Sequence, residues 1–221
     1  MPRALLLLLP VVLLAGCGSV ADVNEFPPVA GPARAAPLTA RPDGRSVRMA
    51  DARALVTAGQ VAILGSGRLR AVLLPRERLL ELQDARTRKR LGRAPAGVGP
   101  THVVTDGHGL IYVVDTVGDA LLVFHVTPRL ELTRRVYLPG APYGVAYDPV
   151  RLRLWVTSTR DNVLRELRAR GRPAVRRTFA AVRQPDAVAV DPRTGRVSVI
   201  GRADGVVQLL DPGYGPRPRS R

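Results

Sequence analysis

The hydrophobic residues between positions 59 and 211 lie in short runs, separated by polar sequences that favour turns. Runs such as HVVTD (102–106), LIYVVD (110–115) and ALLVFHV (120–126) are rich in Val, Leu and Ile. They are too short for helices and typical of β-strands. Between such runs, DPRTG (191–195) predicts a type I turn with Pro at its second position. The pattern therefore predicts an all-β chain.

The runs recur with a fixed period. Three segments align without gaps from Gly99, Ala141 and Gln184, and their prolines, Pro100, Pro142 and Pro185, are 42 and 43 residues apart. A fourth copy, starting at Leu69, overlays the segment from Leu110 at an offset of 41. Four short strands in a repeat of about 42 residues are typical of one blade of a β-propeller.

The repeated motifs are similar to a known type of repeat. PYGVAYD (142–148), followed by RLWVT (153–157) and DNVL (161–164), resembles the YVTN and NHL propeller repeats. The resemblance implies an all-β propeller of about four blades, each with four antiparallel strands. We place the repeats near residues 59–99, 100–141, 142–184 and 185–211.

The last repeat lacks an outer strand. The residues after 204–211 are rich in Pro and Gly, and so do not favour a fourth strand. Residues 45–57 contain SVRM, which resembles AVRR (174–177) of an outer strand, so we predict that this N-terminal segment completes the last blade. A closed ring of four blades, an open arc and a larger ring shared by two chains are three alternatives.

The N-terminus has the composition of a targeting segment. Ala4–Gly16 carries no charge, follows a basic start, and is shorter than the roughly 20 residues of a membrane-spanning helix. Leu14–Cys17 resembles the lipobox of bacterial lipoproteins, which implies a lipid on Cys17 and attachment to the outer side of the cell membrane. We therefore expect a signal peptide (1–16), a flexible tether rich in Pro, Ala and Gly (17–44) and the propeller domain (45–221). An ordinary cleaved signal and a short uncleaved anchor are the alternatives.

The resemblance also implies one face where a ligand would bind. In such propellers, the loops before the first strand and between the second and third strands surround the mouth of the central channel. The residues that we expect on this face are His102, Asp115, Tyr143, Arg160, Arg183, Asp186 and Arg202. They would form a mixed, partly cationic mouth for an anionic or sugar-like ligand, or else they are simply polar loop tips.

Acidic residues that recur in three of the copies have a structural interpretation. Asp106, Asp148 and Asp191 are expected to open turns after the first strand of their blades. A second series, Asp119, Asp161 and Asp204, is expected to bind turn amides before the third strand.

Signatures of catalysis are sparse. Cys17 is the single cysteine and is assigned to lipidation, while His102, His108 and His125 lack the spacing of metal ligands. Ser66 in GSGR lacks the full nucleophile-elbow pattern, and no phosphate loop or dinucleotide fingerprint occurs. We expect no catalytic residue, no metal and no cofactor.

The formal net charge of +16 is unevenly distributed. The excess lies in RTRKRLGR (86–93) and RARGRPAVRR (168–177), both predicted as outer strands. Nucleic acid is not expected as a partner of an exported protein. The charge suits an anionic membrane surface, an envelope polymer or another envelope protein; a solvated rim is the alternative. The sequence thus predicts a binding or scaffolding module of the cell envelope, with a propeller enzyme such as a lactonase or other hydrolase as the competing class.

Overall fold

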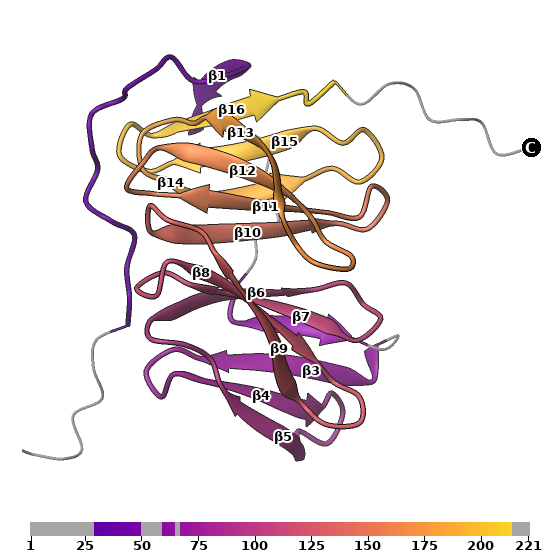
Figure 1. The fold of residues 1–221 in the computed structure, drawn as a ribbon. Helices are drawn as coiled ribbons and strands as arrows, with labels where there is room; N and C mark the ends of the chain where they lie inside the picture. Colours follow the sequence, from indigo (N-terminus) through magenta and orange to yellow (C-terminus); the bar gives the residue numbers. More distant parts are fainter. Residues whose placement is uncertain (1–28, 50–58, 65–66, 214–221) are drawn as a thin grey trace, which may run out of the picture.

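A computed structural model describes residues 29–49, 59–64 and 67–213. They form sixteen strands in four antiparallel sheets of four, and no other regular element (Figure 1). The sheets follow one another along the chain, so the prediction of four blades with four strands each is confirmed.

The blades are numbered in chain order, and their strands are given from the innermost outward. Blade 1 contains β2 (Val61–Leu64), β3 (Leu69–Leu74), β4 (Leu79–Asp84) and β5 (Arg90–Pro95). Blade 2 contains β6 (Pro100–Thr105), β7 (Leu110–Asp115), β8 (Ala120–His125) and β9 (Glu131–Tyr137). Blade 3 contains β10 (Pro142–Asp148), β11 (Arg153–Ser158), β12 (Val163–Arg168) and β13 (Val175–Ala180). Blade 4 contains β14 (Pro185–Val190), β15 (Val197–Gly201), β16 (Val206–Leu210) and β1 (Arg45–Arg48).

The outer strand of blade 4 comes from the N-terminal side of the chain. β1 pairs antiparallel with β16, with Val47 opposite Val207 and Arg45 opposite Leu209. This confirms the prediction that the N-terminal segment completes the last blade, although residues 50–57 of that segment lie outside the described residues. The pairing satisfies the backbone groups of β16, which would otherwise form an exposed sheet edge.

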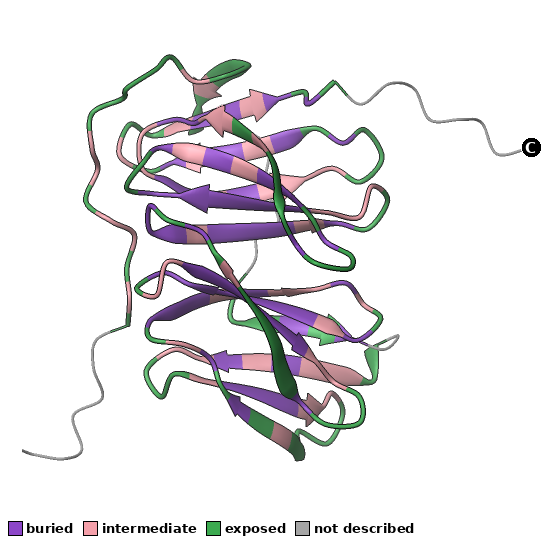
Figure 2. Ribbon diagram, viewed as in Figure 1, coloured by how far each residue is buried: buried purple, intermediate pink, exposed green. Residues whose placement is uncertain are grey.

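Alternating side chains join neighbouring blades. Ile111 and Val113 of β7 pack against blade 1, whereas Tyr112 and Val114 of the same strand pack against blade 3. Burying one such side chain contributes about 1.5–3 kcal/mol. Buried residues therefore line the surfaces between blades, while an outer strand such as β9 is largely exposed (Figure 2).

Three hydrophobic clusters connect the four blades within the described residues. They lie between blades 1 and 2, 2 and 3, and 3 and 4. No such cluster among these residues joins blade 4 to blade 1, and Val61 and Ile63 of β2 remain 49% and 52% exposed. The described residues therefore do not form a closed ring of four blades. They form an arc with uncovered faces on blades 1 and 4, a shape shared by two of the alternatives, the open arc and the ring made by two chains.

The uncovered face of blade 1 carries polar residues at three positions where the corresponding face of blade 2 is apolar. Positions 70, 81 and 83 align with Ile111, Leu122 and Phe124 at the offset of 41, but carry Arg, Glu and Gln. Arg70 donates to Gln83 Oε1 at 2.7 and 2.9 Å, and Gln83 Nε2 donates to Glu81 at 2.8 Å. Terminal repeats of stacked architectures commonly carry such a polar outer face, because no further repeat covers it.

Residues 29–44 lie extended along the loops of blades 2 to 4, at the left side of Figure 1. Ala33 N donates to Thr159 Oγ1 at 2.9 Å, and Gln184 Nε2 donates to Ala33 O at 2.8 Å. Further along, Asn162 Nδ2 donates to the carbonyls of Ala36 and Pro37. The sequence predicts an extended tether here, but these contacts with the blades were not expected.

The proposed signal peptide, Cys17 and residues 18–28 lie outside the described residues. In the described part of the chain, no helix has the length and apolar character needed to cross a bilayer.

Candidate functional site

Four of the predicted site residues lie together at the mouth, which we define as His102, Tyr143, Asp186 and Arg202. The first three follow the prolines that begin the innermost strands β6, β10 and β14. In each strand the register shifts directly after this proline. A shift of this kind bends the strand and re-aims the neighbouring side chains, so the same local device recurs in three blades.

His102 and Tyr143 contact each other across two blades. Their rings meet edge to face, with centroids 4.8 Å apart and an angle of 69° between the planes. Burial lowers the pKa of His102, although the negative charge of Asp186 and a backbone hydrogen bond with Tyr143 oppose this effect. Burial, followed by the charge of Asp186, raises the pKa of Tyr143. At neutral pH the mouth therefore holds a neutral imidazole and a protonated phenol.

Asp186 forms an ion pair with Arg202, whose Nε donates to Oδ2 of the carboxylate. The side chain of Asp186 is only 4% exposed, whereas that of Arg202 is 74% exposed. The second carboxylate oxygen, Oδ1, is buried and has no hydrogen-bond partner among the described residues, and the same holds for His102 Nδ1. Each buried polar atom without a partner costs about 1–3 kcal/mol.

A hollow of about 310 Å³ adjoins the mouth. It is lined by Val29, Ala30, Gly59, Gln60, Thr101, His102 and Tyr143. One wall thus comes from the N-terminal segment and another from the start of blade 1. Sequence reasoning missed both contributions, because neither segment carries a repeated landmark.

Asp115 belongs to the loop scaffold and not to the mouth. Its side chain is buried, and Oδ1 accepts hydrogen bonds from the amides of Val98, Gly99 and Gly118 at 2.7–3.1 Å. A Cβ at Gly118 would lie 2.0 Å from Asp115 Oδ2, so glycine is required for this approach.

The two remaining predicted residues have separate partners. Arg160 lies 3.7 Å from Asp119, and Arg183 Nε donates to Asp204 Oδ1 at 2.9 Å. The first pair links loops of the adjacent blades 2 and 3, and the second links two loops of blade 4. Neither pair includes a residue of the mouth. The structure thus brings together four of the seven predicted residues and assigns three to other contacts.

The repeated acidic residues are structural, with one correction. Asp106 Oδ1 accepts from three turn amides, and Asp148 and Asp191 accept from the amides of their own turns, as expected. The equivalent of Asp119 in blade 3, however, is Asn162 and not Asp161. Asp119 Oδ1 accepts from Ala141 N, and Asn162 Oδ1 accepts from Gln184 N, at the same separation of 22 residues. Both residues have positive φ, of 48° and 52°, a conformation that Asn and Asp adopt more readily than most other residues.

The excess positive charge gathers on one face, which we call the hairpin face. It consists of the turns that join the first to the second and the third to the fourth strands, at the right side of Figure 1. Its exposed cations are Arg68, Arg86, Arg88, Lys89, Arg129, Arg170, Arg172, Arg193 and Arg196. None of them makes an ion pair within the described part of the chain.

Five aspartates of the hairpin face are held by their own turns. Asp84, Asp106, Asp148, Asp191 and Asp211 each accept a hydrogen bond from a nearby backbone amide. The prediction that all of 86–93 and 168–177 form outer strands was wrong in part. Asp84 binds the amides of Arg86 and Thr87 and so fixes a turn, and β5 begins only at Arg90.

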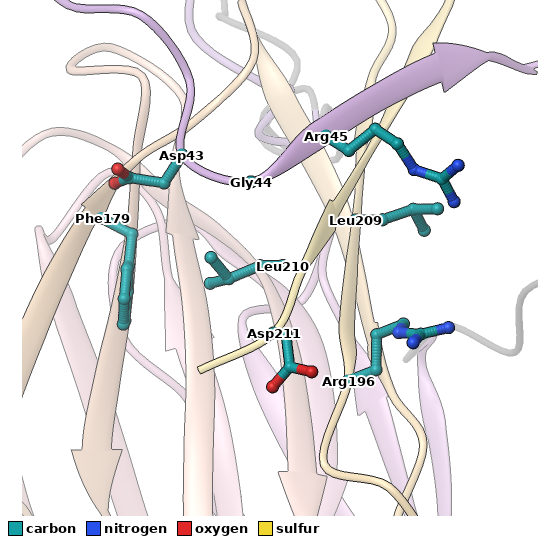
Figure 3. Close-up of a pocket in the computed structure, with 8 residues that line it drawn as sticks. All are labelled: Asp43, Gly44, Arg45, Phe179, Arg196, Leu209, Leu210 and Asp211. Atoms are coloured by element: carbon teal, nitrogen blue, oxygen red, sulfur yellow. The ribbon is translucent and has the colours of Figure 1, made fainter. Parts of the chain in front are cut away.

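Two other hollows are lined by residues whose side chains are engaged in the fold or are mostly apolar. One of about 550 Å³ lies where the N-terminal segment joins blades 3 and 4, and Figure 3 shows Asp43, Phe179 and Leu210 around it. Asp43 is engaged there, because its carboxylate accepts from Ala180 N at 2.7 Å. Another, of about 510 Å³, lies along the inner strands and is mostly apolar in its lining. No group of three or more His, Cys, Asp or Glu side chains suited to a metal occurs in residues 29–49, 59–64 and 67–213.

Known structures share this architecture. The β-propeller domain of Cps50 (Swd1) from Myceliophteria thermophila is 15% identical with a TM-score of 0.59, over 70% of this chain and 53% of that one. This chain has the β-propeller fold. Hydrazine synthase of Kuenenia stuttgartiensis is 18% identical with a TM-score of 0.56, over 72% and 51% of the two chains. Dihydro-heme d1 dehydrogenase NirN, solved in complex with DHE, is 19% identical with a TM-score of 0.60, over 74% and 36%.

The propeller chain spans about half, or less, of the length of these structures. No protein-family model and no curated protein matches its sequence. At these identities the similarity concerns the fold alone.

Proposed function

We propose that this protein is a lipid-anchored binding module on the outer side of a bacterial cell membrane, and that its hairpin face binds an anionic polymer of the cell envelope. The observation that carries the proposal is the excess of positive charge on the hairpin face. Nine exposed cations gather there without an ion pair among the described residues, beside five aspartates that accept hydrogen bonds from turn amides and the exposed Glu131.

A face of this kind attracts polyanions through many weak contacts. Each exposed cation contributes little alone, but a group of one sign raises the local concentration of an oppositely charged partner. Such binding is screened by salt, with a Debye length of about 8 Å at physiological ionic strength. We therefore expect the affinity to fall steeply as salt is added.

The position of the N-terminal segment favours a polymer over the membrane that holds the lipid. Val29 lines the hollow beside the mouth, and residues 29–44 run along the side of the molecule opposite the hairpin face (Figure 1). Twelve residue steps from Cys17 to Val29 span at most about 40 Å. A lipid on Cys17 would thus hold the mouth toward the bilayer and leave the hairpin face directed outward.

The anchor itself rests on the sequence. The run before Cys17 resembles a lipobox, and the single cysteine leaves no disulfide for an exported domain. The packed interfaces between the blades supply stability without one.

The test measures binding of the full chain, in detergent, to immobilised poly(glycerol phosphate). The triple variant Arg86→Ser/Arg88→Ser/Lys89→Ser removes three cations from one hairpin. Its matched control, Arg34→Ser/Arg41→Ser/Arg76→Ser, removes three exposed arginines from outside that face. We expect the first triple to weaken binding at least tenfold and the control less than twofold.

Equal losses in the two triples would show that only net charge matters, and would contradict a hairpin-face site. Preferential binding to phosphatidylglycerol vesicles over the polymer would contradict the choice of partner.

A further inference from the structure

Two buried polar atoms at the mouth lack partners among the described residues: His102 Nδ1 and Asp186 Oδ1. Buried polar atoms in folded proteins are nearly always hydrogen-bonded. Here two such atoms belong to side chains from the innermost strands of blades 2 and 4, and His102 lines a hollow of about 310 Å³. The carboxylate lies close enough to influence the ionisation of both His102 and Tyr143. The mouth is therefore built for a bound group that completes these hydrogen bonds.

The charges of the mouth cancel. The carboxylate of Asp186 is paired with the guanidinium of Arg202, and the imidazole of His102 is neutral because burial lowers its pKa. An ion of either sign would leave one charge uncompensated in a partly buried place. An uncharged ligand avoids that cost.

Hydroxyl groups match the two atoms. The carboxylate oxygen can only accept a hydrogen bond, while the imidazole nitrogen accepts or donates according to its tautomer. A hydroxyl both donates and accepts, so it pairs with either atom in either tautomer. The aromatic ring of Tyr143, half-buried beside His102, offers an apolar surface at the same place.

We propose that the mouth binds an uncharged carbohydrate ring, with hydroxyl groups hydrogen-bonded to Asp186 Oδ1 and His102 Nδ1 and the C–H face packed against Tyr143. The hollow is at the small end of ligand pockets, which span roughly 300–1,000 Å³, and so suits a single ring. This site is independent of the hairpin face, which lies at the other end of the strands.

The experiment uses the full chain in a detergent without a sugar headgroup. Glucose, galactose, mannose and N-acetylglucosamine are tested singly by saturation-transfer NMR. The variant His102→Phe removes the imidazole nitrogens, and the variant Asp186→Asn removes the charge of the carboxylate. Their matched controls are His108→Phe, an exposed histidine on the hairpin face, and Asp204→Asn, another aspartate paired with an arginine.

We expect at least one sugar to bind the wild type, with a loss of at least tenfold in affinity in each mouth variant and no change in the controls. Absence of a signal from all four sugars, or a signal that survives both mouth variants, would overturn the proposal. If the mouth variants fail to fold, the imidazole ¹⁵N resonances of His102 in the wild-type protein show whether sugar binds at the mouth. A shift on addition of sugar supports the site, and an unchanged resonance overturns it. The polymer-binding assay has no bearing on either result.

Discussion

The side chain of Gln208 donates from Nε2 to the carbonyl oxygen of Asp43 at 2.7 Å, and so links β16 to the segment that precedes β1. The same amide nitrogen donates to Ala180 O at 2.9 Å, and Oε1 accepts from Val182 N at 3.1 Å. Gln208 is fully buried. One side chain therefore joins the last strand of the chain, the end of blade 3 and the N-terminal segment.

Gln208→Ala should lower the free energy of unfolding by about 2–3 kcal/mol, because it leaves the Val182 amide and the Asp43 carbonyl without this partner. Urea unfolding at neutral pH measures the change. The control Gln60→Ala removes an exposed glutamine and should change stability by less than about 0.5 kcal/mol. Equal effects of the two substitutions would contradict a closing role for Gln208.

Two truncations test the N-terminal strand. A chain without residues 1–28 keeps β1 and its contacts, whereas a chain without residues 1–49 exposes the edge of β16. We expect the longer truncation to unfold at lower denaturant and to aggregate, because an unpaired edge invites further strands. Thermal melting and light scattering compare the two. If their midpoints coincide, β1 does not complete blade 4.

Glu81 gives the uncovered face of blade 1 a pH dependence. The hydrogen bond from Gln83, followed by those from Arg93 and Arg90, holds the pKa of Glu81 below its ordinary value of 4.5. The ionised carboxylate thus stabilises the fold above pH 4.5, and this contribution is lost as pH falls through the lowered pKa.

Glu81→Gln should therefore be less stable than wild type at pH 7, and the difference should shrink toward pH 3. Urea midpoints across this range measure it. Glu77→Gln, which alters an exposed carboxylate in the adjacent loop, serves as control and should show little difference at any pH. A gap between Glu81→Gln and wild type that persists or widens in acid would rule out this explanation.

Cys17→Ala should release the protein from the membrane fraction, since the proposed lipid has no other attachment point. Cell fractionation and immunoblotting measure the distribution, with Ser19→Ala as control. Membrane attachment that persists in Cys17→Ala would exclude lipidation as the anchor.

The fold was predictable because its determinants are local and repeated. Each blade encodes its own strands and turns, so alternation and a fixed spacing of prolines and aspartates specify them. The completion of blade 4 followed from a missing strand and the cost of an open edge. The absence of a closed ring of four blades has a signal in the sequence, because Arg70, Glu81 and Gln83 stand where blade 2 has apolar residues.

The site was predictable in part. Proximity to the repeated prolines identified His102, Tyr143 and Asp186, because the same strand shift recurs in blades 2, 3 and 4. The partner of a charged residue was not predictable, since Arg160 and Asp119 are far apart in the sequence. Nor was the course of residues 29–44, which are held largely through backbone carbonyls that every sequence possesses.

Amide hydrogen exchange of the full chain, with and without poly(glycerol phosphate), tests whether the hairpin face binds an anionic polymer. We expect the polymer to protect the hairpins at residues 85–89, 169–174 and 191–196, and added salt to remove the protection. Protection confined to residues 29–44 and the mouth, or none at polymer concentrations that saturate binding, would contradict this proposal.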